Sequence, residues 1–199
     1  MRRPSSPAKL LARFSRSERG AAAVEFALIL PFLLTLYMGS IEASSLFTVD
    51  RRVEVIASTM ADLISRWNPN DGTIPKSTVK DYFVASEGII TPYSTSDLSQ
   101  VVSFLQVASD GTAKVLWSCG YNGGTARGAN SAYTLQPNMK DLVTSGFSKS
   151  GFLVAAETKY PYKPVLGMVF TSAIDLRKEA LFLPRFQESL AAPSGGCPT

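Results

Sequence analysis

The chain has 199 residues, a length that suits one globular domain together with a membrane anchor. Its net charge of +4 arises before residue 21, where six basic residues face one acidic residue, and the remainder carries a net charge of −1. That remainder has no basic surplus for binding nucleic acid, and the absence of histidine removes the usual general base and the commonest metal ligand. We therefore expect no nucleic acid, metal or cofactor.

The first twenty residues form a basic leader, rich in serine, proline and arginine, which we expect to be disordered. From Ala21 to about Phe47 the chain is mostly apolar, interrupted by Glu25, Pro31 and Glu42. This length exceeds the roughly 20 residues that cross a bilayer, so the sequence predicts a membrane span over about 21–47. Membrane helices tolerate proline, and we expect Pro31 to kink the helix without ending it. The leader's positive charge predicts a cytoplasmic N-terminus and an exported remainder.

Glu25 is an unusual residue for a membrane span, because a lone ionisable group in hydrocarbon costs about 2.5–3.5 kcal/mol on insertion scales. The leader ends one residue before the helix, which suggests that a new N-terminal amine compensates for this carboxylate. In a membrane bundle, Glu25 of one subunit would pair with the amine of a neighbour. In the alternative, Glu25 lies near the interface and stays hydrated.

Beyond the span, an apolar stripe continues the helix in alternating steps of three and four residues, which is a heptad pattern. Two interpretations remain open: the stripe packs on its own domain, or it packs against copies of the chain or a relative. The segment Asn68–Gly72 contains proline and turn-forming residues that end the helix. The stripe comprises Leu46, Val49, Val53, Ile56, Met60, Leu63 and Trp67.

Residues 68–199 are predicted to form an α+β head with a small antiparallel sheet. Asp110-Gly111 lies between two runs rich in β-forming residues, which is a strong hairpin signal. The glycine-rich segment 120–130 is expected to be a loop. The predicted helices are 76–86 and 135–145, and the predicted strands are 101–108, 112–117, 152–160, 165–174 and 179–183.

Cys119 and Cys197 are the two cysteines of the chain. In an oxidising periplasm they would form one disulfide that ties the C-terminal tail to the head. The alternative is two unpaired thiols, because pairing requires Cα atoms closer than about 7 Å.

Gly20 followed by Ala21-Ala22-Ala23-Val24-Glu25-Phe26, and then by Leu30-Pro31, resembles the TadE-like pseudopilins of the tight-adherence (Tad) pilus system, a branch of the type IV pili. In that family the glycine precedes the cut of a prepilin peptidase, and the glutamate is fifth in the mature chain. The resemblance therefore implies cleavage between Gly20 and Ala21, which places Glu25 fifth. Landmarks of longer TadE/TadG-related proteins follow in order, among them Leu183-Pro184-Arg185.

The resemblance implies a pseudopilin or minor pilin-like component in the bacterial inner membrane, with the head in the periplasm. Its expected partners are other pilins or pseudopilins, Tad inner-membrane assembly proteins, the prepilin peptidase and membrane lipid. One alternative is an uncleaved single-pass anchor that presents a periplasmic scaffold. A second is a secreted protein cut after Ala43, although Ile41 and Glu42 fit the signal-peptidase site poorly.

An enzyme is the alternative from a different class. Ser118-Cys119-Gly120 superficially suggests a nucleophile turn, but the chain has no histidine to activate it. Glu157 and Asp175 are a conceivable acid/base pair, and Gly123-Gly124 lacks the spacing and lysine of a phosphate loop. We therefore predict a non-catalytic protein without a small-molecule substrate.

Overall fold

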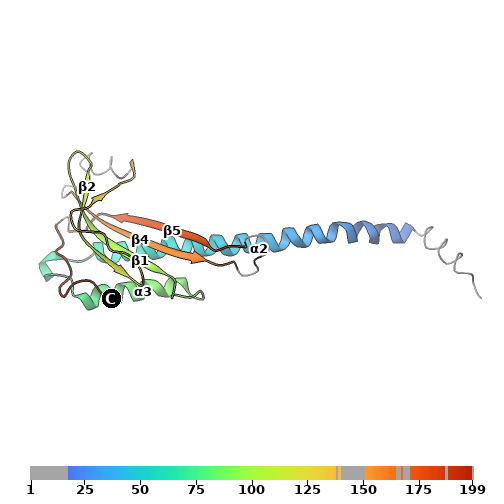
Figure 1. The fold of residues 1–199 in the computed structure, drawn as a ribbon, viewed down its shortest axis with the longest axis horizontal. Coiled ribbons are helices and arrows are strands. Elements are labelled where there is room, and N and C mark those ends of the chain that lie inside the picture. The colour runs from blue at the N-terminus through green and yellow to red at the C-terminus, as the bar shows by residue number, and fades with distance from the viewer. Residues whose placement is uncertain are drawn as a thin grey trace, which may run out of the picture. The chain divides into compact units, whose positions relative to one another are not determined.

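The computed structural model describes residues 18–137, 139, 151–164, 167, 171–186 and 188–198. A long N-terminal helix, α2 (Glu18–Ser65), precedes a five-stranded antiparallel sheet and short helices (Figure 1). The predicted α+β class, with a long helix followed by a small antiparallel head, is confirmed. The remaining elements are η1 (Pro69–Asp71), α3 (Lys76–Glu87), η2 (Gly88–Ile90), β1 (Ser99–Val107), β2 (Ala113–Tyr121), β3 (Ala132–Tyr133), β4 (Phe152–Tyr162) and β5 (Ile174–Phe182).

Two compact units divide the chain. The first comprises residues 1–45 with 164–171, and its described part contains the N-terminal stretch of α2. The second comprises residues 46–163 with 172–199, and contains the rest of α2, helix α3 and the sheet. We refer to this second unit as the head.

The sheet of the head has the strand order β3-β2-β1-β4-β5. The hairpin predicted at Asp110-Gly111 joins β1 to β2, and Gly111 has φ +79°, a conformation that glycine adopts without strain. Phe104 pairs with Trp117 whereas Leu105 pairs with Val115, so Leu116 is the extra residue of a β-bulge. The bulge places Val115 and Trp117 in separate apolar clusters although they are only two positions apart.

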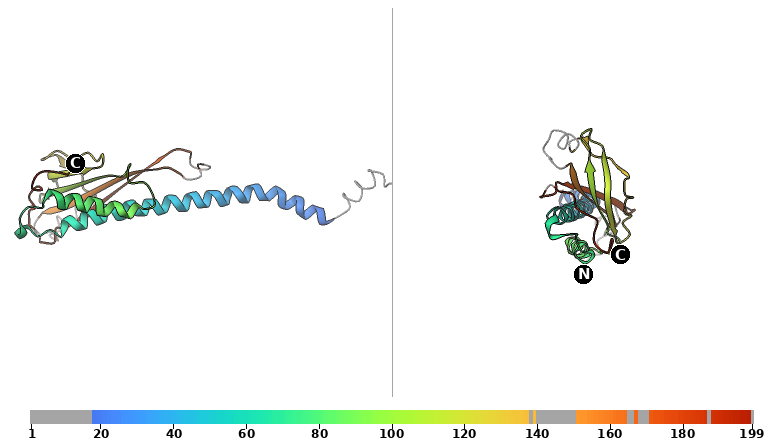
Figure 2. Two further views of the ribbon diagram at one scale, coloured as in Figure 1. Left: turned by 90° about the horizontal axis from the view of Figure 1, so that it is seen from below. Right: turned by 90° about the vertical axis from the view of Figure 1, so that its left-hand side faces the viewer.

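Helices α2 and α3 cover one face of the sheet, as the right-hand view of Figure 2 shows. The apolar stripe of α2 supplies much of this core: Val49, Val53, Ile56 and Met60 are at most 1% exposed. Ala57, Ala61 and Ile64 are also buried, so the buried face of α2 is wider than a two-position heptad seam. The other stripe residues, Leu46, Leu63 and Trp67, are half-buried.

Polar contacts fix α2 to the segment after α3 and to β5. Arg52 donates hydrogen bonds to the carbonyl oxygens of Ile89, at 3.0 Å, and Thr91. The ammonium of Lys178 in β5 lies 2.7 Å from the carboxylate of Asp50 in α2. These contacts join the charged flank of α2 to elements that lie far away in the sequence.

The C-terminal tail lies against the head at three places. Cys197 forms a disulfide with Cys119 of β2, with their Cα atoms 5.2 Å apart. The indole nitrogen of Trp117 donates to the Leu190 carbonyl oxygen at 2.8 Å, and Ser194 exchanges backbone hydrogen bonds with the segment that enters α3.

The structure departs from the sequence prediction most clearly near the C-terminus. The predicted strand 179–183 is part of a longer strand, β5, at Ile174–Phe182. Half of the predicted strand 165–174 lies outside the described residues, and of its described residues only Ile174 is in a strand. Continuous pairing with β4 from Val154 to Tyr162 sets the limits of β5, and it depends on a partner that is distant in sequence. Strand β3 was not predicted, and the predicted helix 135–145 falls largely outside the described residues.

Candidate functional site

The N-terminal stretch of α2 exposes large apolar side chains all around its surface. Leu28 is 75% exposed, Phe32 69% and Leu36 62%. The stretch is long and apolar enough to cross a membrane, and no part of its most apolar window is buried. The 22 residues from Gly20 to Ile41 measure about 33 Å along a helix, close to the thickness of a bilayer's hydrocarbon core. It is therefore a candidate membrane anchor.

The predicted processing residues lie at the start of this helix. Gly20 is in the first turn of α2, where backbone N–H groups lack helical partners, so local unwinding costs little. Ala21 and Glu25 are one turn apart on the same face, separated by about 6 Å along the axis. Gly20, Ala21 and Glu25 are all exposed. The structure thus places the candidate cleavage bond and the carboxylate of Glu25 within about one turn of each other on an exposed helix surface.

Pro31 lies inside α2, which continues through it as one helix. The Thr35 hydroxyl donates to the Pro31 carbonyl oxygen at 2.9 Å, and the Ser40 hydroxyl donates to Tyr37 O at 2.7 Å. These hydroxyls are satisfied within the helix, as a hydrocarbon environment requires. The hydroxyl groups of Thr35 and Ser40 are therefore compatible with membrane insertion.

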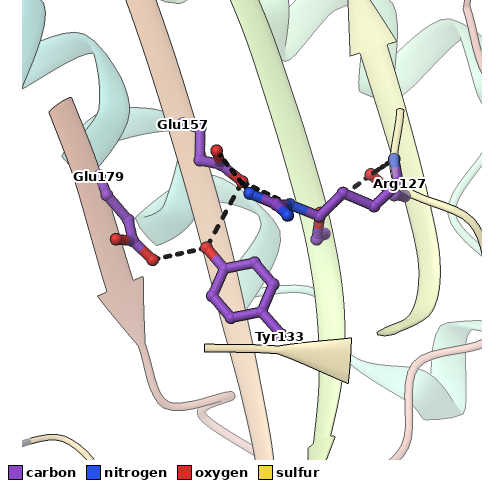
Figure 3. A network of polar contacts seen from close by, with 6 residues as sticks. Arg127, Tyr133, Glu157 and Glu179 are labelled. Atoms are coloured by element: carbon purple, nitrogen blue, oxygen red, sulfur yellow. Dashed lines mark hydrogen bonds and ion pairs between the residues drawn. The ribbon is translucent and has the colours of Figure 1, made fainter. Parts of the chain in front are cut away.

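A polar network lies on the sheet face of the head that is opposite to the helices (Figure 3). Glu157 of β4 and Glu179 of β5 are directly paired across the strands, and such like-charged neighbours repel each other. Arg127 offsets this repulsion by donating two hydrogen bonds to the Glu157 carboxylate, at 2.8 and 2.9 Å. The Tyr133 hydroxyl donates to Glu179 at 2.5 Å, and the Arg127 guanidinium lies 4.6 Å from the Tyr133 ring centre.

The network makes the stability of the head sensitive to high pH. Burial raises the pKa of Tyr133, and its hydrogen bond to Glu179 raises that pKa further. A raised pKa stabilises the fold below the ordinary tyrosine pKa of about 10, and this contribution is lost as pH rises above that value. Above pH ~10 the free energy of unfolding should fall more steeply for the wild type than for Tyr133→Phe, by up to about 1.4 kcal/mol per pH unit.

Denaturant unfolding of the full chain in micelles, followed by tryptophan fluorescence, measures this difference. Burial also raises the pKa of Tyr160, which is present in both proteins, so the comparison isolates Tyr133. Identical slopes in the two proteins would contradict the assignment.

The glycine-rich loop after β2 lies tightly against the sheet. A Cβ on Gly124 would lie 2.1 Å from the Gln100 carbonyl oxygen, and one on Gly120 would lie 1.9 Å from the Gly124 carbonyl oxygen. Arg127 holds the same loop through Glu157 and through its backbone N–H, which donates to Ser118 Oγ at 3.1 Å. The close approach therefore depends on residues without side chains.

Gly124→Ala should consequently destabilise the head by about 1–3 kcal/mol, the usual range for inserting a methyl group into filled space. Gly128→Ala is the matched control, because nothing lies within 4 Å of a Cβ at that position. Denaturant unfolding measures the free energy of unfolding of the two variants. Equal values would show that the loop moves to accommodate the added methyl group without loss of stability.

The enzyme interpretation gains no support from the arrangement of its candidate residues. Glu157 is paired with Glu179, whereas Asp175 is paired with Pro161, so the suggested acid/base residues are not cross-strand neighbours. Cys119 is in a disulfide and the Ser118 hydroxyl is hydrogen-bonded to Ser103 at 2.9 Å. Within the described ranges, no group of three or more His, Cys, Asp or Glu residues could hold a metal ion.

Most residues of the polar network were not predicted from the sequence. Glu157 was considered only with Asp175 as a conceivable acid/base pair, and Arg127, Tyr133 and Glu179 were not singled out. Tyr133 and Glu179 are 46 residues apart, and only the register of β4 and β5 shows which carboxylates face each other. A single sequence contains no local signal of such a register.

A protein-family model matches the sequence of helix α2. Residues 20–62 match the family described as TadE-like protein, which confirms the resemblance found in the sequence. The match begins at Gly20 and includes most of α2. No curated protein and no solved structure matches the chain.

Proposed function

We propose, on the premise of this TadE-like match, that the chain is a pseudopilin or minor pilin-like component of Tad pilus assembly, processed after Gly20 by a prepilin peptidase. The observation that carries the proposal is that the match starts at the glycine before the expected cut and continues along an exposed apolar helix. The family is one of structural pilus components, and we propose a non-catalytic role for this chain.

The proposed location is the inner membrane, with a cytoplasmic N-terminus and a periplasmic head. The one candidate span among the described residues and the basic residues that precede it in the sequence support this orientation. The disulfide between Cys119 and Cys197 is consistent with an oxidising compartment for the head.

The proposed assembly step is a charge pairing in the membrane. Cleavage creates a protonated amine on Ala21, and the Glu25 carboxylate of a neighbouring subunit pairs with it. Each group then offsets the other's burial in hydrocarbon, which is costly for an isolated charge. Before cleavage this amine does not exist, so processing would license assembly.

Other pilins or pseudopilins, Tad inner-membrane assembly proteins and lipid are the proposed partners. The surface of the head would determine which of them bind. The stripe residues Val49, Val53, Ile56 and Met60 are buried in the core of the head, so they are not available for contacts with other subunits. Contacts between subunits along α2 would then use the exposed apolar stretch before residue 42. An uncleaved single-pass anchor with a periplasmic scaffold head is the second candidate, and it shares every feature except the cut.

Deletion of the gene and complementation test the proposal. Cells that lack the protein should lose Tad pili, seen by electron microscopy, and the wild-type gene should restore them. Gly20→Leu should not restore them, whereas Gly128→Ala should, because its Cβ meets no neighbour. Normal pili in the deletion strain would contradict a role in pilus assembly.

A further inference from the structure

A cavity of about 310 Å³ lies between the glycine-rich loop and the sheet, on the sheet face that carries the polar network of Glu157 and Glu179. Gly123, Gly124 and Thr125 form its loop wall, and Lys159 and Arg177 are its cationic lining residues on β4 and β5. All these residues belong to the head.

The two cationic side chains of the cavity repel each other when no anion lies between them. Lys159 and Arg177 are directly paired across β4 and β5, which places like charges opposite each other. The Lys159 ammonium has a partner in Asp175 at 3.0 Å. The Arg177 guanidinium forms no ion pair or hydrogen bond with any residue that the structure describes. Its guanidinium therefore keeps its donors available to an anion.

The adjacent cross-strand pair shows how the head treats such repulsion elsewhere. Glu157 and Glu179 also carry like charges, but Arg127 and Tyr133 satisfy them. For Lys159 and Arg177, the described residues supply one anionic ion-pair partner, Asp175, and it pairs with Lys159.

The walls of the cavity are held in place before any ligand arrives. The loop wall is fixed by the close approach of Gly124 to Gln100 and by the two hydrogen bonds from Arg127 to Glu157. The other wall is formed by paired strands. A site that is already ordered loses little conformational entropy on binding.

We propose that this cavity binds a carboxylate carried by an acidic side chain of a protein partner, with Arg177 as the main recognition residue. The planar guanidinium matches a carboxylate with two parallel hydrogen bonds, and Lys159 adds a second positive charge. This inference concerns the head alone and does not depend on cleavage at Gly20.

Two features favour a peptide carboxylate over a phosphate group. Glu157 also lines the cavity, so its negative charge would repel a phosphate dianion more strongly than a single carboxylate. The Glu157 carboxylate could also accept a hydrogen bond from a peptide N–H. In addition, β5 is the last strand of the sheet, and a peptide at an edge strand can pair its backbone groups.

Nuclear magnetic resonance on the full, ¹⁵N-labelled chain in micelles tests the proposal. The probes are an acetylated and amidated Gly-Asp-Gly peptide, the matched Gly-Asn-Gly peptide and inorganic phosphate. The aspartate peptide should shift the amide signals of Gly123, Gly124 and Thr125 in a saturable manner. Arg177→Gln should weaken this binding at least about tenfold, as expected for a lost hydrogen bond between charged groups.

The matched control is Arg51→Gln, which removes an exposed arginine of α2 whose ion pair is with Glu54, and should leave binding unchanged. Equal binding of the asparagine peptide, or unchanged binding by Arg177→Gln, would overturn the proposal. Tighter binding of phosphate than of the aspartate peptide would also overturn it, because the site would then be one for inorganic anions.

Discussion

Glu25→Ala should leave membrane insertion and cleavage unchanged and should reduce incorporation into the pilus assembly by roughly 100-fold. If the proposed pairing is correct, the substitution leaves the Ala21 amine of the neighbouring subunit without its carboxylate in hydrocarbon. An unpaired ionisable group there costs about 2.5–3.5 kcal/mol, and each 1.36 kcal/mol corresponds to a tenfold change. Quantitative immunoblotting of sheared pilus and membrane fractions measures incorporation, and the mobility of the membrane-bound chain reports cleavage.

Glu54→Ala is the matched control for this experiment. Glu54 is also an exposed glutamate of α2, but it lies in the head and pairs with Arg51 at 3.4 Å. Its loss should affect incorporation little, because exposed ion pairs contribute at most about 1 kcal/mol. If Glu25→Ala is cleaved and incorporated like the wild type, Glu25 stays hydrated near the interface and the pairing is wrong.

Loss of the disulfide should be the largest change in the stability of the head. Cys119 and Cys197 are separated by 78 residues, and cross-linking a loop of this length stabilises a fold by about 4.5 kcal/mol in the chain-entropy model. Cys197→Ser should lower the free energy of unfolding by that amount. Trp117 should report the change, because its indole donates to Leu190 in the same tail.

Reduction of the wild-type protein provides an independent check of the same value. Denaturant unfolding of the full chain in micelles, with and without dithiothreitol, should bring the wild type to the stability of Cys197→Ser. Dithiothreitol should have no effect on the variant. Equal stability of the oxidised wild type and the variant would mean that the disulfide contributes nothing to the stability of the head.

Local patterns predicted the elements whose signals lie within one short stretch. The apolar run before Glu42 indicated a membrane helix, and the spacing from Val49 to Met60 indicated a helix with one buried face. Asp110-Gly111 predicted the hairpin because glycine accepts the positive φ of the turn. Pro75 and Gly88 bracket α3 closely, as expected for residues that begin and end helices.

The rest depended on contacts between distant residues. Strand β5 acquires its limits from β4, and its alternating charges gave no continuous apolar signal. The bulge at Leu116 moves Trp117 to the helix-covered face, which no period-two pattern anticipates. The pairing of Glu157 with Glu179, and of Lys159 with Arg177, follows only from that register, so the network and the cavity became visible only in the folded chain.

The first residue of the chain purified from whole bacterial cultures, cells and medium together, tests the central proposal most directly. Edman sequencing or N-terminal peptide mass spectrometry should find Ala21 in cells with a prepilin peptidase and Met1 in cells without it. Met1 in both strains would contradict processing and favour the uncleaved anchor. Ser44 would instead identify a secreted protein whose anchor is removed.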